Sequence, residues 1–149
     1  MSKSANKTVQ NQVSAVSISS DSRDLETLYE ITQVLNLQEP INDVLQQVLY
    51  ILEKQMDMKR GTIALVNTET NALEVHIAHG LTESEKKRGI YKIGEGITGK
   101  VVATGQPMFI PNIGEAPQFL NKMKARDKKR HFNNAFICVP IKTEQTVVG

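Results

Sequence analysis

Three closely spaced glycines, Gly94, Gly96 and Gly99, followed by Lys100, form the pattern with the clearest chemical potential in this sequence. The glycines match the G-x-G-x-x-G pattern that cradles a dinucleotide, and Gly94 to Lys100 also has the spacing of a P-loop. A P-loop needs Ser or Thr after its lysine to hold magnesium, and Val101 stands there instead. A dinucleotide site needs this turn at the first βα junction, whereas two helices and a hairpin are predicted before it. We therefore interpret the glycines as a tight structural turn, and leave open that the turn also lines a ligand pocket.

No group of histidines, cysteines or carboxylates converges in the sequence. His76 and His79 are three residues apart in a predicted strand, so they point to opposite faces unless the strand is bulged. His131 lies in a basic segment, and the single cysteine, Cys138, lies in an apolar strand, which predicts an ordinary buried thiol. One cysteine also excludes an internal disulfide and a dithiol redox pair. We expect no metal site and no catalytic residue.

The net charge of +2 is unevenly distributed along the chain. Acidic residues exceed basic ones up to residue 80, and basic residues exceed acidic ones after it. Such a patch attracts phosphates or an acidic partner surface, but a solvated face is the simpler interpretation. No aromatic residue is interleaved with the basic ones, so we expect no direct contact with nucleic acid. The basic cluster consists of Lys122, Lys124, Arg126, Lys128, Lys129 and Arg130, opposed by Asp127.

The length of 149 residues suits one domain, and a hydrophobic content of 40% suffices for a core. The sequence has neither an apolar run of membrane-spanning length nor the pattern of a secretory signal. With one cysteine, these features favour a cytoplasmic setting and no membrane contact. Residues 1–23 are polar and rich in serine, which predicts a flexible leader before a domain over residues 24–149.

Apolar spacing predicts two helices followed by an antiparallel sheet. The helices cover Asp24–Leu37 and a second segment in which Pro40 takes the first helical position and the apolar stripe continues to Met56. Their apolar surface exceeds what one small sheet covers, so we expect them to pair with a second copy, in a homodimer through these helices, or with segments outside this sequence. Helices gathered at one end of a meandering sheet indicate an α+β fold, with the N-terminal helices packed on one side of an antiparallel sheet. The other predicted elements are strands over Gly61–Asn67, Ala72–His79, Ile90–Ile93, Pro107–Pro111, Ala135–Lys142 and from Thr146 onward, a short helix or loop over Thr82–Arg88, a short helix ending at Gly105, and a polar connection over Asn112–Asn134.

Several of these segments resemble the GAF domain family. They are Gly94-Glu-Gly-Ile-Thr-Gly-Lys-Val101, Pro107-Met-Phe-Ile-Pro-Asn112 and Phe136-Ile-Cys-Val-Pro-Ile141. The last of these, with Pro117-Gln-Phe-Leu120, is similar to the amino-terminal GAF domain of Nif-specific regulatory proteins of the NifA type, which are activators that work with sigma-54 RNA polymerase. The resemblance covers roughly residues 24–149. It implies a GAF-like sheet whose last strand only begins here, so that we expect the rest of that strand and a closing helix to be missing.

The resemblance further implies a regulatory domain that senses a ligand or a partner. It would control an ATPase domain in the full protein, which would also carry a DNA-binding domain; neither is in these residues. A small-molecule effector such as 2-oxoglutarate and a nitrogen-signalling regulatory protein are the implied ligand and partner. The alternative is a GAF sensor of another signalling protein, such as a histidine kinase or cyclase. The implied pocket lies between the sheet and the segments Ile93–Thr98 and Asn112–Phe136, with candidate ligand-binding residues Ile93, Glu95, Gly96, Ile97, Thr98, Asn112, Phe119 and Phe136.

Other roles of GAF domains fit this sequence less well. Bilin attachment uses a Cys followed by His, whereas Val139 follows Cys138. Methionine sulfoxide reduction needs several cysteines. The Asn-Lys-x-Phe signature of cyclic-nucleotide sites is not matched, since Asn121-Lys-Met-Lys124 lacks the Phe.

Overall fold

The chain forms two compact units, Met1–Lys59 and Arg60–Gly149, in a computed structural model that describes residues 22–126, 134–144 and 146–149. The predicted leader, residues 1–23, lies outside the described residues except for residues 22 and 23, which are helical. His131 and the last three residues of the basic cluster also lie outside them. Among the described helices, none is both long and apolar enough to cross a membrane.

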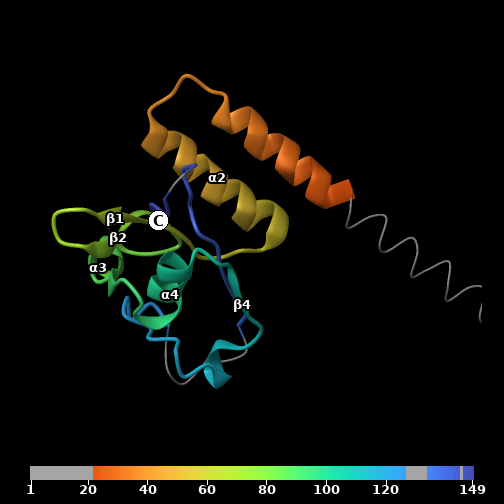
Figure 1. The fold of residues 1–149 in the computed structure, drawn as a ribbon. Helices are drawn as coiled ribbons and strands as arrows, with labels where there is room; N and C mark the ends of the chain where they lie inside the picture. The colour runs from red at the N-terminus through yellow and green to blue at the C-terminus, as the bar shows by residue number, and fades with distance from the viewer. Residues whose placement is uncertain (1–21, 127–133, 145) are drawn as a thin grey trace, which may run out of the picture. The chain divides into compact units, whose positions relative to one another are not determined.

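The first unit is a pair of helices. Residues 22–35 form the first helix and α2 covers Ile41–Met56; the two lie side by side (Figure 1). The Gln55 side-chain amide donates to the Glu30 carboxylate at 3.1 Å, which ties the end of α2 to the first helix. Pro40 is the N-cap of α2 and not its first helical residue, because its ψ of 134° is still extended.

The second unit begins with a three-stranded antiparallel sheet in the order β1-β2-β3. These strands are β1 (Gly61–Asn67), β2 (Ala72–His79) and β3 (Ile90–Lys92). The β1–β2 turn closes because the Asn67 side-chain oxygen accepts from the amides of Glu69 and Thr70, and Asn71 adopts a left-handed conformation. The register shifts between Ile63 and Ala64, so that His76 of β2 has no partner in β1 and forms a bulge.

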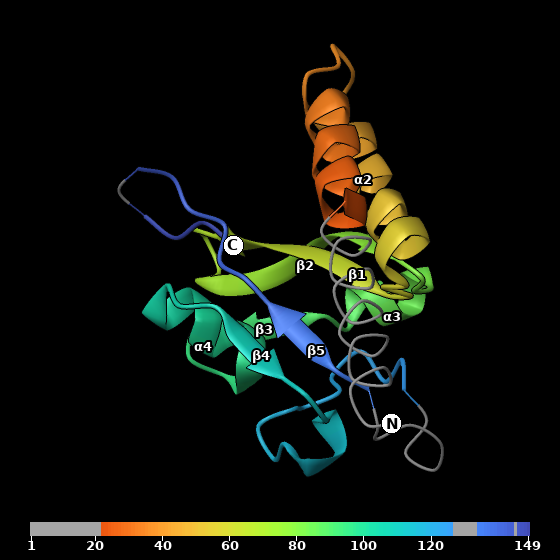
Figure 2. The ribbon, with the colours of Figure 1, turned by 90° about the vertical axis from the view of Figure 1, so that its right-hand side faces the viewer.

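A second antiparallel pair joins β4 (Met108–Ile110) to β5 (Phe136–Cys138), which are shown side by side in Figure 2. Strand β5 is shorter than the predicted Ala135–Lys142. Pro140 has no amide proton with which to continue the ladder. The chain beyond it pairs elsewhere, because Ile141 and Lys142 face the last residues of the chain.

The end of the chain links the two sheets. The amide of Val66 in β1 donates to the Val148 carbonyl at 2.9 Å. On the other edge of this segment the Val148 amide donates to the Ile141 carbonyl, and the Ile141 amide donates to the Gly149 carbonyl, both at 2.8 Å. Lys142 and Val147 form an antiparallel bridge. The strand predicted from Thr146 onward is therefore present as a short segment that pairs on both of its edges.

Helix α4 (Gly96–Thr104) packs against both sheets, and its left-handed C-cap is Gly105, as predicted. One core cluster contains Val101, which is 1% exposed, together with Ile110 and Ile113. The other cluster contains Val102, Tyr91 and the fully buried Leu73. Two shorter helical segments complete the unit: α3 (Glu83–Lys87) and the 3-10 turn Ile113–Glu115. The predicted Thr82–Arg88 segment is thus helical at its centre. Its capping box, in which Thr82 and Glu85 each bind the other's backbone amide, explains why.

Candidate functional site

A pocket lies within the second unit, between the sheet and an irregular segment. One side is formed by β1, β2, β3 and the first turn of α4, which we call the ordered wall. The other side is residues 117–126, which we call the irregular wall. The cavity volume is about 60 Å³, several times the roughly 10–15 Å³ that one water molecule needs. The lining residues are Arg60, Thr62, Ala64, Val75, Leu81, Tyr91, Gly96, Ile97, Thr98, Phe119, Leu120, Asn121, Met123, Ala125, Arg126 and Phe136.

The glycine cluster positions the first turn of α4 at this pocket. Gly94 has a φ of +86°, a conformation that favours glycine, and nothing lies within 4 Å of where its Cβ would be. Gly99 is needed for space, because a Cβ there would collide with the Lys92 carbonyl oxygen and lie 3.1 Å from the Gly94 nitrogen. The turn follows β3, which is antiparallel to β2, so it is not the βα junction of a parallel unit. The structural interpretation of these glycines is confirmed, and Gly96 also lines the pocket.

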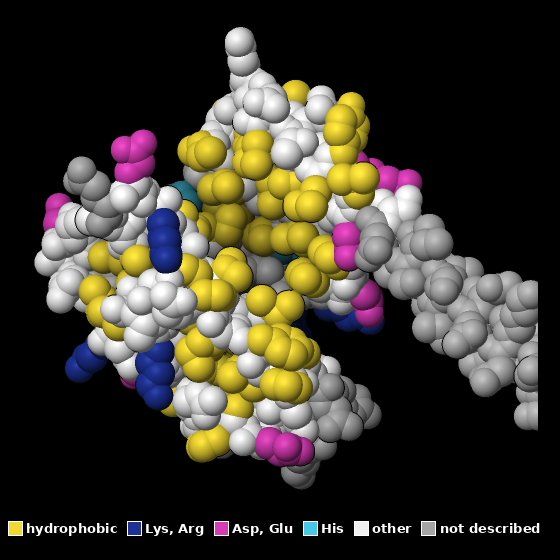
Figure 3. Space-filling view, turned by 45° about the vertical axis from the view of Figure 1, so that its right-hand side comes forward, with side chains coloured by type: hydrophobic (Ala, Val, Ile, Leu, Met, Phe, Trp, Pro, Cys, Tyr) yellow, Lys and Arg dark blue, Asp and Glu magenta, His cyan; other side chains and the backbone are white. Residues whose placement is uncertain are grey.

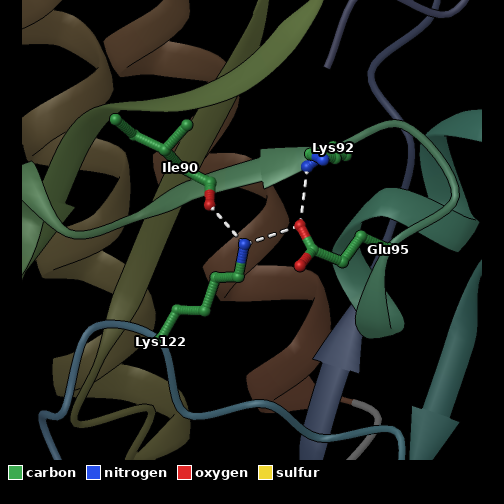
Figure 4. Close-up of polar contacts among 4 residues, drawn as sticks. All are labelled: Ile90, Lys92, Glu95 and Lys122. Carbon is green, nitrogen blue, oxygen red and sulfur yellow. Dashed lines mark hydrogen bonds and ion pairs between the residues drawn. The ribbon is translucent and has the colours of Figure 1, made fainter.

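Glu95, the N-cap of α4, is absent from the pocket lining and binds Lys122 (Figure 4). The Lys122 ammonium donates to the Glu95 carboxylate at 2.6 Å and to the Ile90 carbonyl at 3.0 Å. The same carboxylate oxygen accepts from the Lys92 amide at 2.8 Å. The hydrogen bond from Lys122, followed by that from Lys92, lowers the pKa of Glu95. The carboxylate therefore stays ionised and its charge is matched by that of Lys122.

The irregular wall is attached to the rest of the second unit mainly through side chains. Lys122 lies 5.3 Å from the centre of the Tyr91 ring, in a cation–π contact. The Arg88 guanidinium donates twice to the Met123 carbonyl, at 2.8 and 3.1 Å. Phe119 packs edge-on against Phe136 with ring centres 5.5 Å apart. A few polar and aromatic contacts thus hold this wall, in place of a strand ladder.

Two arginines bring positive charge to the pocket. Arg60 precedes β1, and Arg126 ends the irregular wall, where its guanidinium lies 5.2 Å from the centre of the Phe119 ring. Burial, and then the charge of Arg60, lower the pKa of Arg126, although an arginine with this shift remains protonated at neutral pH. The described lining residues include no Asp or Glu. The interpretation of the basic cluster as a solvated face is therefore wrong for Arg126, and also for the partly buried Lys122.

Five of the eight candidate ligand-binding residues line the pocket: Gly96, Ile97, Thr98, Phe119 and Phe136. The other three do not. Glu95 binds Lys122, Ile93 is 40% exposed, and the Asn112 side chain accepts from the Gly114 amide as the cap of the 3-10 turn. The ligand-binding role of the five remains a prediction.

Sequence reasoning missed the contribution of β1 and of the two arginines. Thr62 and Ala64 alternate along β1, which places both on one face, so strand periodicity could have suggested them. Arg60 carried no signal beyond its charge. Arg126 was assigned to solvent with its basic neighbours, because periodicity says nothing about an irregular segment.

Two other candidate groups show no sign of reactivity. Burial raises the pKa of the Cys138 thiol, and a hydrogen bond with Thr98 only partly opposes this, so at neutral pH the group is a thiol. Strand β2 is bulged at His76, and a bulge allows His76 and His79 to face the same side of the sheet. Even so, no group of three or more metal-ligating side chains occurs in the described part of the chain.

Comparison with known families identifies the domain. The family model of the GAF domain matches residues 40–149, which is most of the chain. This chain belongs to the GAF domain family. The glycine turn before α4, the pocket and the paired end of the chain all lie within the matched region of this GAF domain.

Similar proteins include two nitrogen fixation proteins and a Nif-specific regulatory protein. The nitrogen fixation protein AnfA of Azotobacter vinelandii is 39% identical over 125 residues, covering 84% of this chain and 23% of that protein. VnfA of the same organism is 34% identical, and the match covers 84% of this chain and 24% of VnfA. The Nif-specific regulatory protein of Azospirillum brasilense is 35% identical, and the match covers 88% of this chain and 21% of that protein. This GAF domain thus spans about a quarter of the length of these relatives.

Solved structures agree with the α+β fold, which is confirmed. The A. aeolicus nlh2 GAF domain, crystallised in an inactive state, is 30% identical with a TM-score of 0.73, covering 87% of this chain and 76% of that one. The GAF domain of an Acinetobacter phosphoenolpyruvate-protein phosphotransferase is 20% identical with a TM-score of 0.68, and the match covers 84% of this chain and 72% of that one. The second likeness shows the fold alone.

Proposed function

We propose that this GAF domain is the sensory domain of a transcription activator of nitrogen fixation genes. In the full protein it would control an ATPase domain that acts on sigma-54 RNA polymerase. The observation that carries the proposal is the 39% identity to AnfA over 84% of this chain. The relatives' names describe nitrogen fixation proteins and Nif-specific regulators.

The pocket supports a sensing role more than a catalytic one. Its lining is largely apolar, and its polar groups are two arginines, two threonines, Asn121 and Tyr91. Burial, with smaller contributions from Glu95 and Cys138, raises the pKa of Tyr91, so that this phenol stays protonated at neutral pH. A pocket of this kind binds and orients a small molecule but holds no activated nucleophile beside a base. The ligand would act by stabilising the irregular wall, which has no strand ladder and is held by side-chain contacts.

A promoter assay tests the proposal in the full-length protein that carries this chain. Ala64→Leu adds volume inside the pocket, whereas Ala103→Leu adds the same volume at an exposed position of α4 and serves as the matched control. We expect A64L to change the response of a nitrogen-fixation promoter to nitrogen supply and A103L to leave it unchanged. If deletion of residues 1–149 and A64L both leave that response intact, the sensory proposal is wrong.

We also propose that the helical unit mediates a homodimer. Leu25, Leu28 and Tyr29 are 69%, 60% and 65% exposed, and their spacing places them on one face of the first helix. Hydrophobic side chains are visible on the surface of the helical unit in Figure 3. Sedimentation of the 149-residue chain should show a dimer that Leu28→Glu weakens and that Gln33→Glu, at an exposed polar position, does not. A monomer at every accessible concentration would contradict this proposal.

The remaining expected partner is a nitrogen-signalling regulatory protein, which would act on the same full-length activator. The described residues of this domain give no feature for base recognition, and we assign DNA binding to another part of the full protein.

A further inference from the structure

Basic side chains gather on the second unit where the end of α3, the start of β3 and the irregular wall meet. The residues of this basic face are Arg60, Arg88, Lys122, Lys124 and Arg126. The Arg88 guanidinium donates to the carbonyl of Met123, which lies between the two lysines in the chain, and Lys122 donates to the Ile90 carbonyl (Figure 4). Burial, and then the charge of Arg60, lower the pKa of Arg126, which places these two guanidinium groups near each other. One cluster of cations therefore spans several elements.

Carboxylates balance only part of this charge. Glu95 pairs with Lys122 at 2.6 Å. Hydrogen bonds from Thr82, and then the charges of two arginines of the basic face, lower the pKa of the nearby Glu85. The four cations other than Lys122 form no ion pair with any residue that the structure describes. Five positive and two negative charges leave a net charge of +3, which attracts an acidic surface.

Two of the arginines are held in place without losing their charge. Arg88 uses two of its N–H groups on the Met123 carbonyl, and the Arg126 guanidinium lies 5.2 Å from the centre of the Phe119 ring. A carbonyl and a ring fix a guanidinium but do not neutralise it, and N–H donors remain on each group. Such arginines lose little conformational freedom when they bind a carboxylate, with which a guanidinium forms two parallel hydrogen bonds.

The neighbouring side chains favour a protein over a nucleic acid as the partner. The ring of Tyr91 is 8% exposed and that of Phe119 packs against two other side chains, so neither ring is free to stack on a base. Apolar side chains are exposed instead: Ile90 at 50% and Leu120 at 43%, each two residues from a cation of the basic face. Exposed apolar groups beside arginines are typical of protein interfaces.

We propose that the basic face is a docking surface for an acidic, partly apolar segment of a protein partner. Carboxylates of that segment bind the arginines and lysines, and its apolar side chains cover Ile90 and Leu120. Arg60 and Arg88 lie shortly before β1 and β3, whereas the other three cations belong to the irregular wall, so the bound segment joins this wall to the sheet. This inference goes beyond the proposed function, because it does not depend on what the pocket binds or on which genes are regulated.

The test uses a short peptide of glutamates interrupted by leucines as the probe. It is compared with the same peptide carrying serine in place of leucine and with duplex DNA of equal charge. Each is titrated at constant salt into the isotopically labelled 149-residue chain, and NMR follows the amides of residues 85–90 and 119–126. We expect saturable shifts at these amides with the leucine peptide, and weaker binding of the serine peptide and of DNA.

Substitutions then locate the site. Arg60→Glu and Lys124→Glu together reverse two exposed charges of the basic face and should weaken binding of the leucine peptide by about tenfold or more. The matched control, Lys100→Glu with Lys142→Glu, makes the same change in net charge at exposed positions elsewhere in the second unit and should alter affinity less than about twofold. If R60E/K124E fails to fold, R60Q/K124Q removes the same two charges without reversing them and should still weaken binding severalfold.

Several results would overturn the inference. If the leucine peptide gives no saturable shifts, or if the serine peptide or the DNA binds as tightly, the basic face does not dock a segment of this kind. Equal weakening by the two pairs of substitutions would show that only the net charge of the chain matters, and would also contradict the proposal. The promoter assay with A64L remains a separate test of the sensory function, because Ala64 lies outside the basic face.

Discussion

The two walls of the pocket are built in different ways. The ordered wall consists of paired strands and a helix whose side chains enter two core clusters, with Leu73 and Val101 completely or almost completely buried. The irregular wall, residues 117–126, has no strand partner in the structure described here. Its main attachments are Lys122 on Glu95 and Ile90, Arg88 on the Met123 carbonyl, and the contact between Phe119 and Phe136.

This difference predicts which part of the domain opens more easily. Breaking the ordered wall exposes core and ladder together, so its opening costs nearly the whole free energy of unfolding. The irregular wall can open by breaking a few contacts, most of them partly exposed. A small ligand supplies enough differential binding energy to shift such a local equilibrium, but not to rearrange a core.

Removing core volume from the ordered wall should have the largest effect. Leu73 is fully buried between α4, β1 and β3 residues, and Leu73→Ala should lower the free energy of unfolding by about 2–5 kcal/mol. Urea denaturation measures this. Ile137→Ala, at a position that is 55% exposed, is the control and should cost far less. Similar losses for the two variants would mean that the core is not where we place it.

Two glycine substitutions in the turn before α4 should differ in cost for separate reasons. Gly99→Ala forces a Cβ against the Lys92 carbonyl, so we expect a loss of about 3 kcal/mol, the upper end for overpacking. In Gly94→Ala the new Cβ contacts no other atom and only the left-handed φ is unfavourable, so we expect a loss of about 1 kcal/mol of stability. Thermal and urea denaturation measure both. The reverse order would contradict our account of the turn.

Loosening the irregular wall should change local opening more than global stability. Lys122→Met removes the hydrogen bonds to Glu95 and Ile90, and we expect less than about 1 kcal/mol of global stability to be lost, as for other partly exposed ion pairs. Hydrogen exchange at the amides of residues 119–126 should accelerate severalfold. Lys124→Met, at an exposed position on the same wall, is the control. A uniform acceleration across both walls would show that the walls open as one unit.

Acid should produce the smallest effect and should act through Glu95. Because its pKa is lowered in the folded state, Glu95 contributes stability that is present above its ordinary pKa of about 4.3 and is lost as the pH falls through the folded value. Urea denaturation at pH 6 and near pH 3 measures the loss, and Glu95→Gln should reduce it. Glu85, whose pKa is also lowered, should retain part of the pH dependence. An identical pH dependence in E95Q would rule out the ion pair as its cause.

Much of the ordered wall could be predicted from the sequence, and little of the irregular wall could. The hairpin, the helix ending at Gly105 and the pairing of the segment after Thr146 follow from periodicity, glycine and turn residues. The expected length of β5 was wrong because Pro140 interrupts a run that is apolar throughout. Contacts such as Arg88 with Met123, 35 residues apart, depend on the tertiary path of an irregular segment, which no local pattern encodes. For the same reason Arg126 was expected in solvent.

Residue-resolved native-state hydrogen exchange tests the contrast between the two walls most directly. The amides of Phe119 and Lys124, which bond to the Ala116 and Asn121 carbonyls, report on the irregular wall; those of the β1–β2 ladder report on the ordered wall. We predict that the amides of Phe119 and Lys124 exchange through local opening at a much lower free energy than the amides of the ladder. Equal opening free energies in the two walls would contradict the account.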